Sequence, residues 1–274
     1  MTADAKRSSL WPRILAAAVL VPAALAAVYV GGWTLALWVT AAGIAMALEW
    51  TAIVHRERIG WRLGLHVVAL AASQALLALG RADWALASIL FAALIGNLAA
   101  RGREERGVWV VLGIVYIAIP CLALVWLRQH SPYGFETVIW LFLVVWATDS
   151  AAYVAGSVIG GPKLAPAISP SKTWAGAIAG LAAGIAATIA FAQWIGSGAD
   201  PKFVALGALL SLLTQCGDLA ESVLKRSFGV KDASDLIPGH GGALDRLDGM
   251  IFATLGLAAY VAAAETSPLA WIIP

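Results

Sequence analysis

Charged side chains crowd into one stretch near the end of the sequence, KDASDLIPGHGGALDRLDG, residues 231–249, which contains four aspartates. Asp245 and Asp248 lie three residues apart, so on a helix they would be one turn apart and could face the same ion. The glycines before them let backbone approach a phosphate closely. Oxygen ligands without a Cys/His set favour Mg²⁺ over zinc. The stretch therefore predicts metal-dependent phosphate chemistry. For His240, a loop histidine bonded to backbone and a direct chemical role both remain open.

A second set of ionisable residues ends the preceding apolar run, in TQCGDLAESVLKR, residues 214–226. Asp218, Glu221 and Lys225 fall at i, i+3 and i+7, which is one stripe of a helix. Glu221 and Lys225 are spaced for an i,i+4 ion pair. Asp218 lies seven residues before Lys225, the first basic residue at the end of this apolar run. It therefore needs a cation, for which a metal ion is a good candidate.

Asp149 lies inside another apolar run, in WATDSAAYVAGSVIGG, residues 146–161. An aspartate within a membrane helix is costly unless it pairs, binds an ion or faces water. The alternative is a structural hydrogen bond to a neighbouring helix. Asp149 is therefore a candidate for the same site.

In the segment PKLAPAISPSKTWAG, residues 162–176, Pro166 and Pro170 exclude a long helix. Ser169, Ser171 and Thr173 stand just before the next apolar run and predict a helix N-terminus with Lys172 beside it. Such an N-terminus suits a phosphate. The alternative is an ordinary serine or threonine cap with an interfacial lysine.

The composition requires a membrane to hold these motifs. The 274 residues are 61% hydrophobic and only 12% charged, against about 25% charged in an ordinary soluble domain. Apolar runs of membrane-spanning length predict an all-α polytopic protein with about nine transmembrane helices. They lie near 12–30, 34–54, 63–80, 84–100, 108–127, 136–156, 174–195, 203–224 and 248–264.

The distribution of basic residues predicts the orientation. With these spans, fifteen of the 18 lysines and arginines fall in connections on one face of the membrane and three on the other. The positive-inside rule then puts the N-terminus in the cytoplasm and supports an odd number of spans. A net charge of +2 gives no reason to expect nucleic acid as a partner.

Ionisable groups divide the chain into two regions. Residues 1–135 contain few of them within the spans, Glu49 being the notable one, and we interpret them as a scaffold of transmembrane helices with a dimer-forming or lipid-facing part. Residues 136–274 carry the long cytoplasmic connections around 157–173 and 225–247, where function is usually sited. This second region is predicted to be catalytic.

Taken together, three helices would bring carboxylates to the cytoplasmic membrane surface, and the adjoining loops would surround them with basic residues. The basic residues are Lys163, Lys172, Lys225, Arg226, Lys231 and Arg246. Carboxylates, a divalent ion and a ring of cations are what phosphoryl or nucleotidyl transfer needs. The residues alone therefore predict metal-dependent phosphate chemistry on a lipid.

Residues 222–248, SVLKRSFGVKDASDLIPGHGGALDRLD, resemble the signature of the phosphatidate cytidylyltransferases, or CDP-diacylglycerol synthases. The matching elements are S-x-x-K-R, K-D-x-S, P-G-H-G-G and L-D-R-x-D, in the order and spacing of the family. GDLAES, SPSKTWAG and TDSAAYVAG also resemble family motifs, so the likeness covers about 145–250 in detail. The resemblance implies that CTP and phosphatidic acid give CDP-diacylglycerol and pyrophosphate, at the cytoplasmic side of a bacterial-type inner membrane.

The resemblance also implies roles for individual residues, a Mg²⁺ cofactor, a second ion (K⁺ or another divalent) and a homodimer. The metal-binding aspartates would be Asp218 and Asp245, which join Lys225 and Arg246 as the catalytic set. Substrate binding would involve Asp149, Ser169, Lys172, Thr173, Glu221, Arg226, Lys231, His240, Gly241 and Asp248. Many family members carry a Lys near Gly161, a Lys or Gly at Ser171 and a Glu or Gln at Ala175, so here Lys163 and Lys172 would do more of the phosphate binding in that loop.

Three other functions could use residues of these types. A CTP-dependent enzyme acting on another lipid, such as a polyprenol kinase or a CDP-archaeol-type synthase, would share the core chemistry. A CDP-alcohol phosphotransferase is disfavoured because its D-G-x-x-A-R pattern is absent. An ion-coupled transporter could use Asp149 and Asp218 as cation sites, but transporters often show internal repeats and midplane polar groups. Here the polar groups gather at one face.

Overall fold

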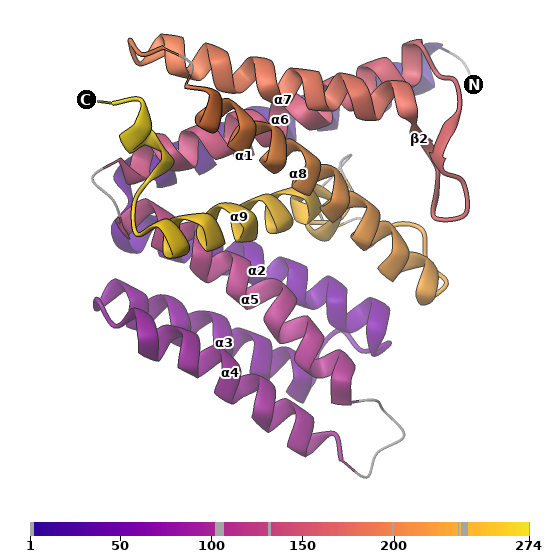
Figure 1. The fold of residues 1–274 in the computed structure, drawn as a ribbon. Coiled ribbons are helices and arrows are strands. Elements are labelled where there is room, and N and C mark those ends of the chain that lie inside the picture. Colours follow the sequence, from indigo (N-terminus) through magenta and orange to yellow (C-terminus); the bar gives the residue numbers. More distant parts are fainter. Residues whose placement is uncertain are drawn as a thin grey trace. The chain divides into compact units, whose positions relative to one another are not determined.

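The computed structural model describes residues 3–101, 107–130, 133–198, 200–234, 236 and 241–273, with the backbone alone for 3–15 (Figure 1). This part of the chain is mostly helical. Its helices are α1 (Ala3–Val30), α2 (Gly32–Val54), α3 (Trp61–Ala78), α4 (Ala82–Ala99), α5 (Gly107–His130), α6 (Gly134–Val158), α7 (Trp174–Trp194), α8 (Pro201–Ser227) and α9 (Leu244–Ala264), followed by the 3₁₀ turn η1 (Pro268–Trp271). In the described part, α2 to α9 are each long and apolar enough to cross a membrane, and α1 has a shorter apolar stretch, Ala16–Val30.

The prediction of an all-α polytopic membrane protein is confirmed. Each predicted span coincides with a helix, and the ends agree within four residues except at the start of α1. The division between α1 and α2 falls at Gly31 and Gly32, whose φ angles of 69° and 51° lie in the left-handed region that favours glycine. Two adjacent glycines therefore end one apolar helix and begin the next.

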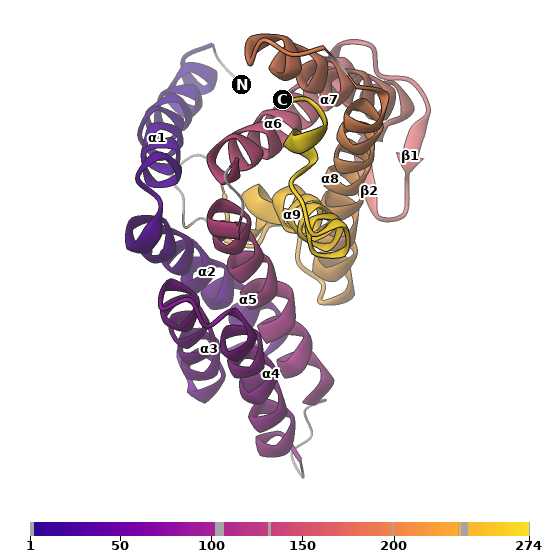
Figure 2. The same ribbon diagram turned by 60° about the vertical axis from the view of Figure 1, so that its left-hand side comes forward.

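The connection between α6 and α7 is a short antiparallel hairpin of two strands, β1 (Lys163–Ala165) and β2 (Ser169–Thr173). Both strands are labelled in Figure 2. Ser169 and Ser171 lie in β2, with their hydroxyls 3.4 Å apart, so the prediction that they belong to the helix N-terminus is wrong. Pro170 favours an extended residue before it, and pairing with β1 keeps the segment extended. Thr173 alone caps α7, by accepting a hydrogen bond from the Gly176 N–H at 3.1 Å.

The chain divides into two compact units, and each is described by itself. The first unit contains residues 1–126 and 228–247, and the second contains residues 127–227 and 248–274. In the first, α2 packs against α1 and α3, and α3 packs against α4. In the second, α6, α7 and α8 pack against one another. The segment 228–247 thus groups with the N-terminal helices, whereas the division predicted at residue 135 placed it in the C-terminal region. The roles assigned to those regions stay predictions.

Close helix packing in the second unit depends on small residues and buried hydroxyls. The Thr188 hydroxyl of α7 donates to the Gly184 carbonyl at 2.9 Å and accepts from the Trp140 indole of α6 at 3.2 Å. Gly207 of α8 faces the same hydroxyl, and a Cβ there would lie 2.1 Å from it. Small residues and interhelical hydrogen bonds are the usual means by which membrane helices associate. These contacts fix α8, which carries the candidate site at its C-terminal end.

Candidate active site

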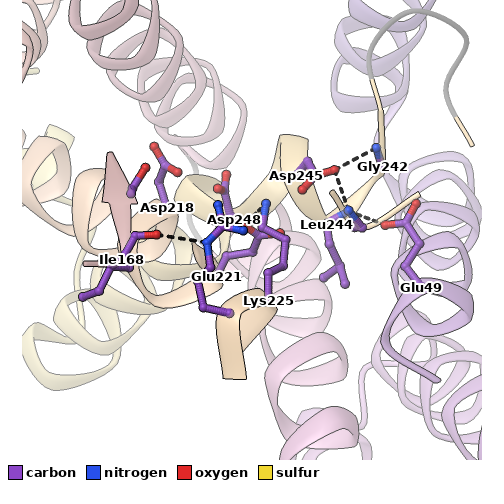
Figure 3. Close-up of polar contacts among 12 residues, drawn as sticks. Glu49, Ile168, Asp218, Glu221, Lys225, Gly242, Leu244, Asp245 and Asp248 are labelled. Atoms are coloured by element: carbon purple, nitrogen blue, oxygen red, sulfur yellow. Dashed lines mark hydrogen bonds and ion pairs between the residues drawn. The ribbon is translucent and has the colours of Figure 1, made fainter. Parts of the chain in front are cut away.

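Two ion pairs lie at the C-terminal end of α8, within the second unit. Lys225 and Glu221 pair through Nζ and Oε2 at 2.6 Å, which confirms the predicted i,i+4 pair. Lys172 of β2 forms an ion pair with Asp218 through Nζ and Oδ2. The cation that Asp218 was predicted to need is therefore supplied at least in part by Lys172. Figure 3 shows Asp218, Glu221 and Lys225 on this helix.

Asp248 of α9 completes an acidic cluster in the same unit. Its side chain is buried and lies in the negative field of Asp218, Glu221 and Asp149, and its Oδ1 accepts the Gly249 N–H at 2.7 Å. Gly217 permits this approach, because a Cβ there would lie 2.3 Å from the Asp248 carbonyl oxygen. Carboxylates from α6, α8 and α9 thus gather at one place.

Arg226 adds a third cation beside this cluster. Its Nε donates to the Ile168 carbonyl in the β1–β2 turn at 3.3 Å. This bond and the pair between Lys172 and Asp218 both join α8 to the hairpin. Lys163 is exposed on β1. The second unit therefore contains four of the six predicted phosphate-binding cations, Lys163 and Lys172 on the hairpin and Lys225 and Arg226 on α8.

Asp245 lies at the start of α9, in the first unit. Its side chain accepts hydrogen bonds from the segment that precedes the helix, which we call the motif-bearing loop (residues 228–243). Its Oδ2 accepts two backbone N–H groups, from Ala233 at 3.1 Å and Gly242 at 3.0 Å. Gly241 has a φ of 81°, which lies in the left-handed region, so the loop requires a residue such as glycine there. The predicted catalytic aspartate thus holds the backbone of residues 233 and 242 through one carboxylate oxygen.

Glu49 of α2 accepts hydrogen bonds from the same loop. The sequence alone did not predict these partners. Its Oε1 accepts from the Ser234 hydroxyl at 2.5 Å and the Ala243 N–H at 2.8 Å, and its Oε2 accepts from the Leu244 N–H at 2.8 Å. Figure 3 shows Glu49 beside Leu244 and Gly242. In the sequence, Glu49 stood out only as an acidic residue inside an apolar run.

The remaining predicted site residues have different outcomes. Lys231 and Arg246 are exposed within the first unit, as cations that meet a soluble substrate should be. His240 lies outside the described residues. Asp218 and Asp245 belong to different units, so their joint binding of one ion stays a prediction.

The carboxylates of the second unit are oxygen donors, the kind of ligand that Mg²⁺ takes in proteins. Among the described residues, no group of three or more His, Cys, Asp and Glu side chains has the arrangement of a ready-made metal site. Mg²⁺ in phosphate-transferring sites is held by one or two carboxylates, with substrate phosphates and water as the other ligands. In the second unit, Lys172 and Lys225 already pair with Asp218 and Glu221, and Asp248 lies beside both acids.

Comparison with known proteins places the chain in a family. Residues 11–264 match the model of the cytidylyltransferase family. A phosphatidate cytidylyltransferase of Brucella suis biovar 1 (strain 1330) is 41% identical over 246 residues, which cover 90% of this chain and 91% of the relative. Shorter matches join it to the phosphatidate cytidylyltransferases of Staphylococcus aureus (strain COL), 38% identical over 52% of this chain and 54% of the relative, and of Haemophilus influenzae, 35% identical over 44% of each. The resemblance is therefore confirmed, and the chain is an enzyme that belongs to the cytidylyltransferase family.

Proposed function

We propose that this enzyme transfers the cytidylyl group of CTP to phosphatidic acid, and so makes CDP-diacylglycerol and pyrophosphate. The relatives are phosphatidate cytidylyltransferases, which supports this choice of substrates. The observation that supports it in this chain is the cluster of carboxylates and cations at the end of α8. That combination suits a reaction in which negative charge moves between phosphates.

The reaction requires no protein nucleophile, because the lipid phosphate monoester is already anionic at neutral pH. One of its oxygens forms a bond to the α-phosphorus of CTP, while the bond from that phosphorus to the β-phosphate oxygen breaks and pyrophosphate leaves. Lys172, Lys225 and Arg226 would hold phosphate oxygens in line for this displacement. Their positions are set beforehand by Asp218, Glu221 and the Ile168 carbonyl, which reduces the entropy lost on ordering the substrates.

The proposal includes Mg²⁺, for which Asp218 of the second unit and Asp245 of the first are each a candidate ligand. When bound, the ion would polarise phosphoryl oxygens and stabilise the charge on the leaving pyrophosphate. Asp149, Glu221 and Asp248 would support Asp218 within the second unit, and a second ion, K⁺ or another divalent, belongs to the same proposal. Lys231 and Gly241 of the motif-bearing loop and Arg246 of α9 would contact substrate phosphates.

We further propose that the enzyme is a homodimer in the bacterial inner membrane with its site on the cytoplasmic side. The asymmetry of basic residues supports the orientation, since fifteen of 18 fall on the face predicted to be cytoplasmic. The bacterial relatives support the choice of membrane.

Radiolabelled CTP tests the reaction directly. Purified enzyme in detergent with Mg²⁺ and phosphatidic acid should move the label of [α-³²P]CTP into lipid and release unlabelled pyrophosphate, and EDTA should abolish both. [γ-³²P]CTP should leave the lipid unlabelled, whereas a lipid kinase would transfer the γ label. Diacylglycerol, which lacks the attacking phosphate, is the matched control acceptor. Absence of α-label transfer by protein shown to be folded would refute the proposal.

A further inference from the structure

Glu49 joins the N-terminal helices to the loop that carries the family motif. It lies near the end of α2 and is only 3% exposed. Its three hydrogen-bond donors, Ser234, Ala243 and Leu244, come from residues 185 to 195 positions further along the chain. A buried carboxylate that accepts three donors is a specific arrangement, because a buried charge is tolerated only when it is paired or hydrogen-bonded.

Two of those donors stand at the N-terminus of α9. The first N–H groups of a helix have no partner within the helix, and a side chain at the N-cap usually accepts one of them. Here the residue before the helix is Ala243, which has no polar side chain. Glu49 supplies the missing acceptor from another helix, and its negative charge is favourable at the positive end of the α9 dipole.

The remaining contacts show that the loop is shaped around this carboxylate. A Cβ on Gly242 would lie 2.8 Å from Glu49 Oε2, so the absence of a side chain there lets the backbone reach the acid. Asp245, one residue beyond Leu244, accepts the Gly242 and Ala233 N–H groups. Glu49 and Asp245 therefore hold opposite sides of the same short backbone segment.

The start of the loop is also attached to the N-terminal helices. Arg56 donates to the Phe228 carbonyl at 2.9 Å, and the Phe228 ring packs edge-on against Trp109 with centroids 4.8 Å apart. The loop is thus anchored at its beginning by Arg56 and Trp109 and at its end by Glu49. The anchor at the end is the one that adjoins the proposed catalytic residues.

We propose that Glu49 is a positioning residue for cytidylyl transfer. It fixes the first turn of α9 and thereby the direction in which Asp245 and Arg246 are presented. The inference rests on the proposed function for its reaction, but the clamp itself can be measured without turnover. Glu49 touches neither substrate in this account and acts through its hydrogen bonds to the Ser234 hydroxyl and to the backbone of residues 243 and 244.

The test compares Glu49→Gln with Thr51→Val in the full-length enzyme. Glutamine keeps the size of the side chain but turns one acceptor into a donor, which opposes a backbone N–H. Thr51 is buried on the same helix and its hydroxyl bonds to the Ala47 carbonyl of its own helix, so its substitution controls for general damage to α2. Ser234→Ala removes a single donor and serves as a milder second variant if Glu49→Gln folds poorly.

Two measurements are needed for each variant. In hydrogen–deuterium exchange, amides 243 and 244 of Glu49→Gln should exchange at least about tenfold faster than in the wild type, as expected for loss of a charge-assisted hydrogen bond. Cytidylyl transfer should fall about 10- to 100-fold, and the Mg²⁺ concentration for half-maximal rate should rise, because Asp245 is no longer held. Ser234→Ala should change both in the same direction by less, and Thr51→Val should match the wild type.

The outcomes separate the clamp from the reaction. Unchanged exchange at 243 and 244 in Glu49→Gln would overturn the clamp. Faster exchange with wild-type transfer and wild-type Mg²⁺ dependence would overturn the positioning role and leave the proposed function standing. If the wild type transferred no cytidylyl group, the proposed function would fail instead, and the exchange result would still decide whether Glu49 holds α9.

Discussion

Exchanging Glu221 and Lys225 on α8 separates an ion pair that stabilises the helix from a cation that binds phosphate. The variant Glu221→Lys with Lys225→Glu keeps an i,i+4 pair but moves the positive charge by one helical turn. Lys225→Met, in contrast, removes the cation and leaves the carboxylate in place. Lys225 should be needed at its own position only if it contacts a substrate.

The expected magnitudes follow from burial and helix position. The Glu221 side chain is 1% exposed and that of Lys225 13%, and removing one partner of a buried pair costs about 3–5 kcal/mol. The exchanged pair places a carboxylate in the last turn of α8, where the helix dipole opposes it by about 0.3–1 kcal/mol. Lys225→Met should thus be strongly destabilised, and the exchanged variant by only about 1 kcal/mol. Both should lose at least about 10²-fold in cytidylyl transfer, as when one charge-stabilising donor is removed.

Thermal unfolding in detergent, followed by circular dichroism, and transfer from [α-³²P]CTP measure the two effects separately. Lys202→Met is the matched control, because Lys202 is an exposed lysine at the opposite end of the same helix. Recovery of both stability and transfer in the exchanged variant would show that Lys225 acts only through its ion pair. A Lys225→Met protein as stable as the wild type would refute the burial argument.

Further predictions concern the metal, the packing and the pH dependence. Asp218→Asn and Asp245→Asn should each lower cytidylyl transfer at least about 10²-fold by removing a proposed Mg²⁺ ligand; near-normal rates would take that residue out of the metal site. Gly207→Ala should lower the free energy of unfolding by about 1–3 kcal/mol because its methyl group meets a buried threonine hydroxyl, whereas Gly64→Ala, which meets open space, should not; equal melting temperatures would contradict this. Burial, and then a nearby arginine, lower the pKa of His55 from 6.5 to about 4, so the unfolded chain binds more protons and stability should fall from pH 6.5 toward pH 4. Melting curves of wild type and His55→Gln at pH 7 and pH 5 check this, since only the wild type should show that contribution.

The helices were predictable because their signal is local. The helices α2 to α9 are apolar runs long enough for the membrane, and the very short connection at Gly31 and Gly32 contains the residues that end a helix. The hairpin was not predictable, since prolines at 166 and 170 exclude a long helix without specifying an extended pair. For the same segment, the sequence left open a phosphate-binding helix N-terminus or an ordinary threonine cap. The structure shows a threonine cap at Thr173.

The site was predictable in composition but only partly in pairing. Glu221 and Lys225 pair because their spacing on one helix dictates it. The Lys172–Asp218 pair and the Glu49 contacts join residues far apart in the sequence, and a single sequence holds no local pattern that specifies such contacts. Glu49 could be recognised only as a costly acid in an apolar run.

Because residues 228–247 group with the N-terminal helices, the chain cannot be cut into its two units at one position. The chain leaves the second unit after residue 227, enters the first, and returns at residue 248, so no single cut yields two complete units. A fragment that begins at α6 would encode Asp218 and Asp245 but not the acceptor for the first amides of α9. Minimal active fragments should therefore retain α2, and chimaeras between relatives should exchange α2 and the 228–247 loop as one block.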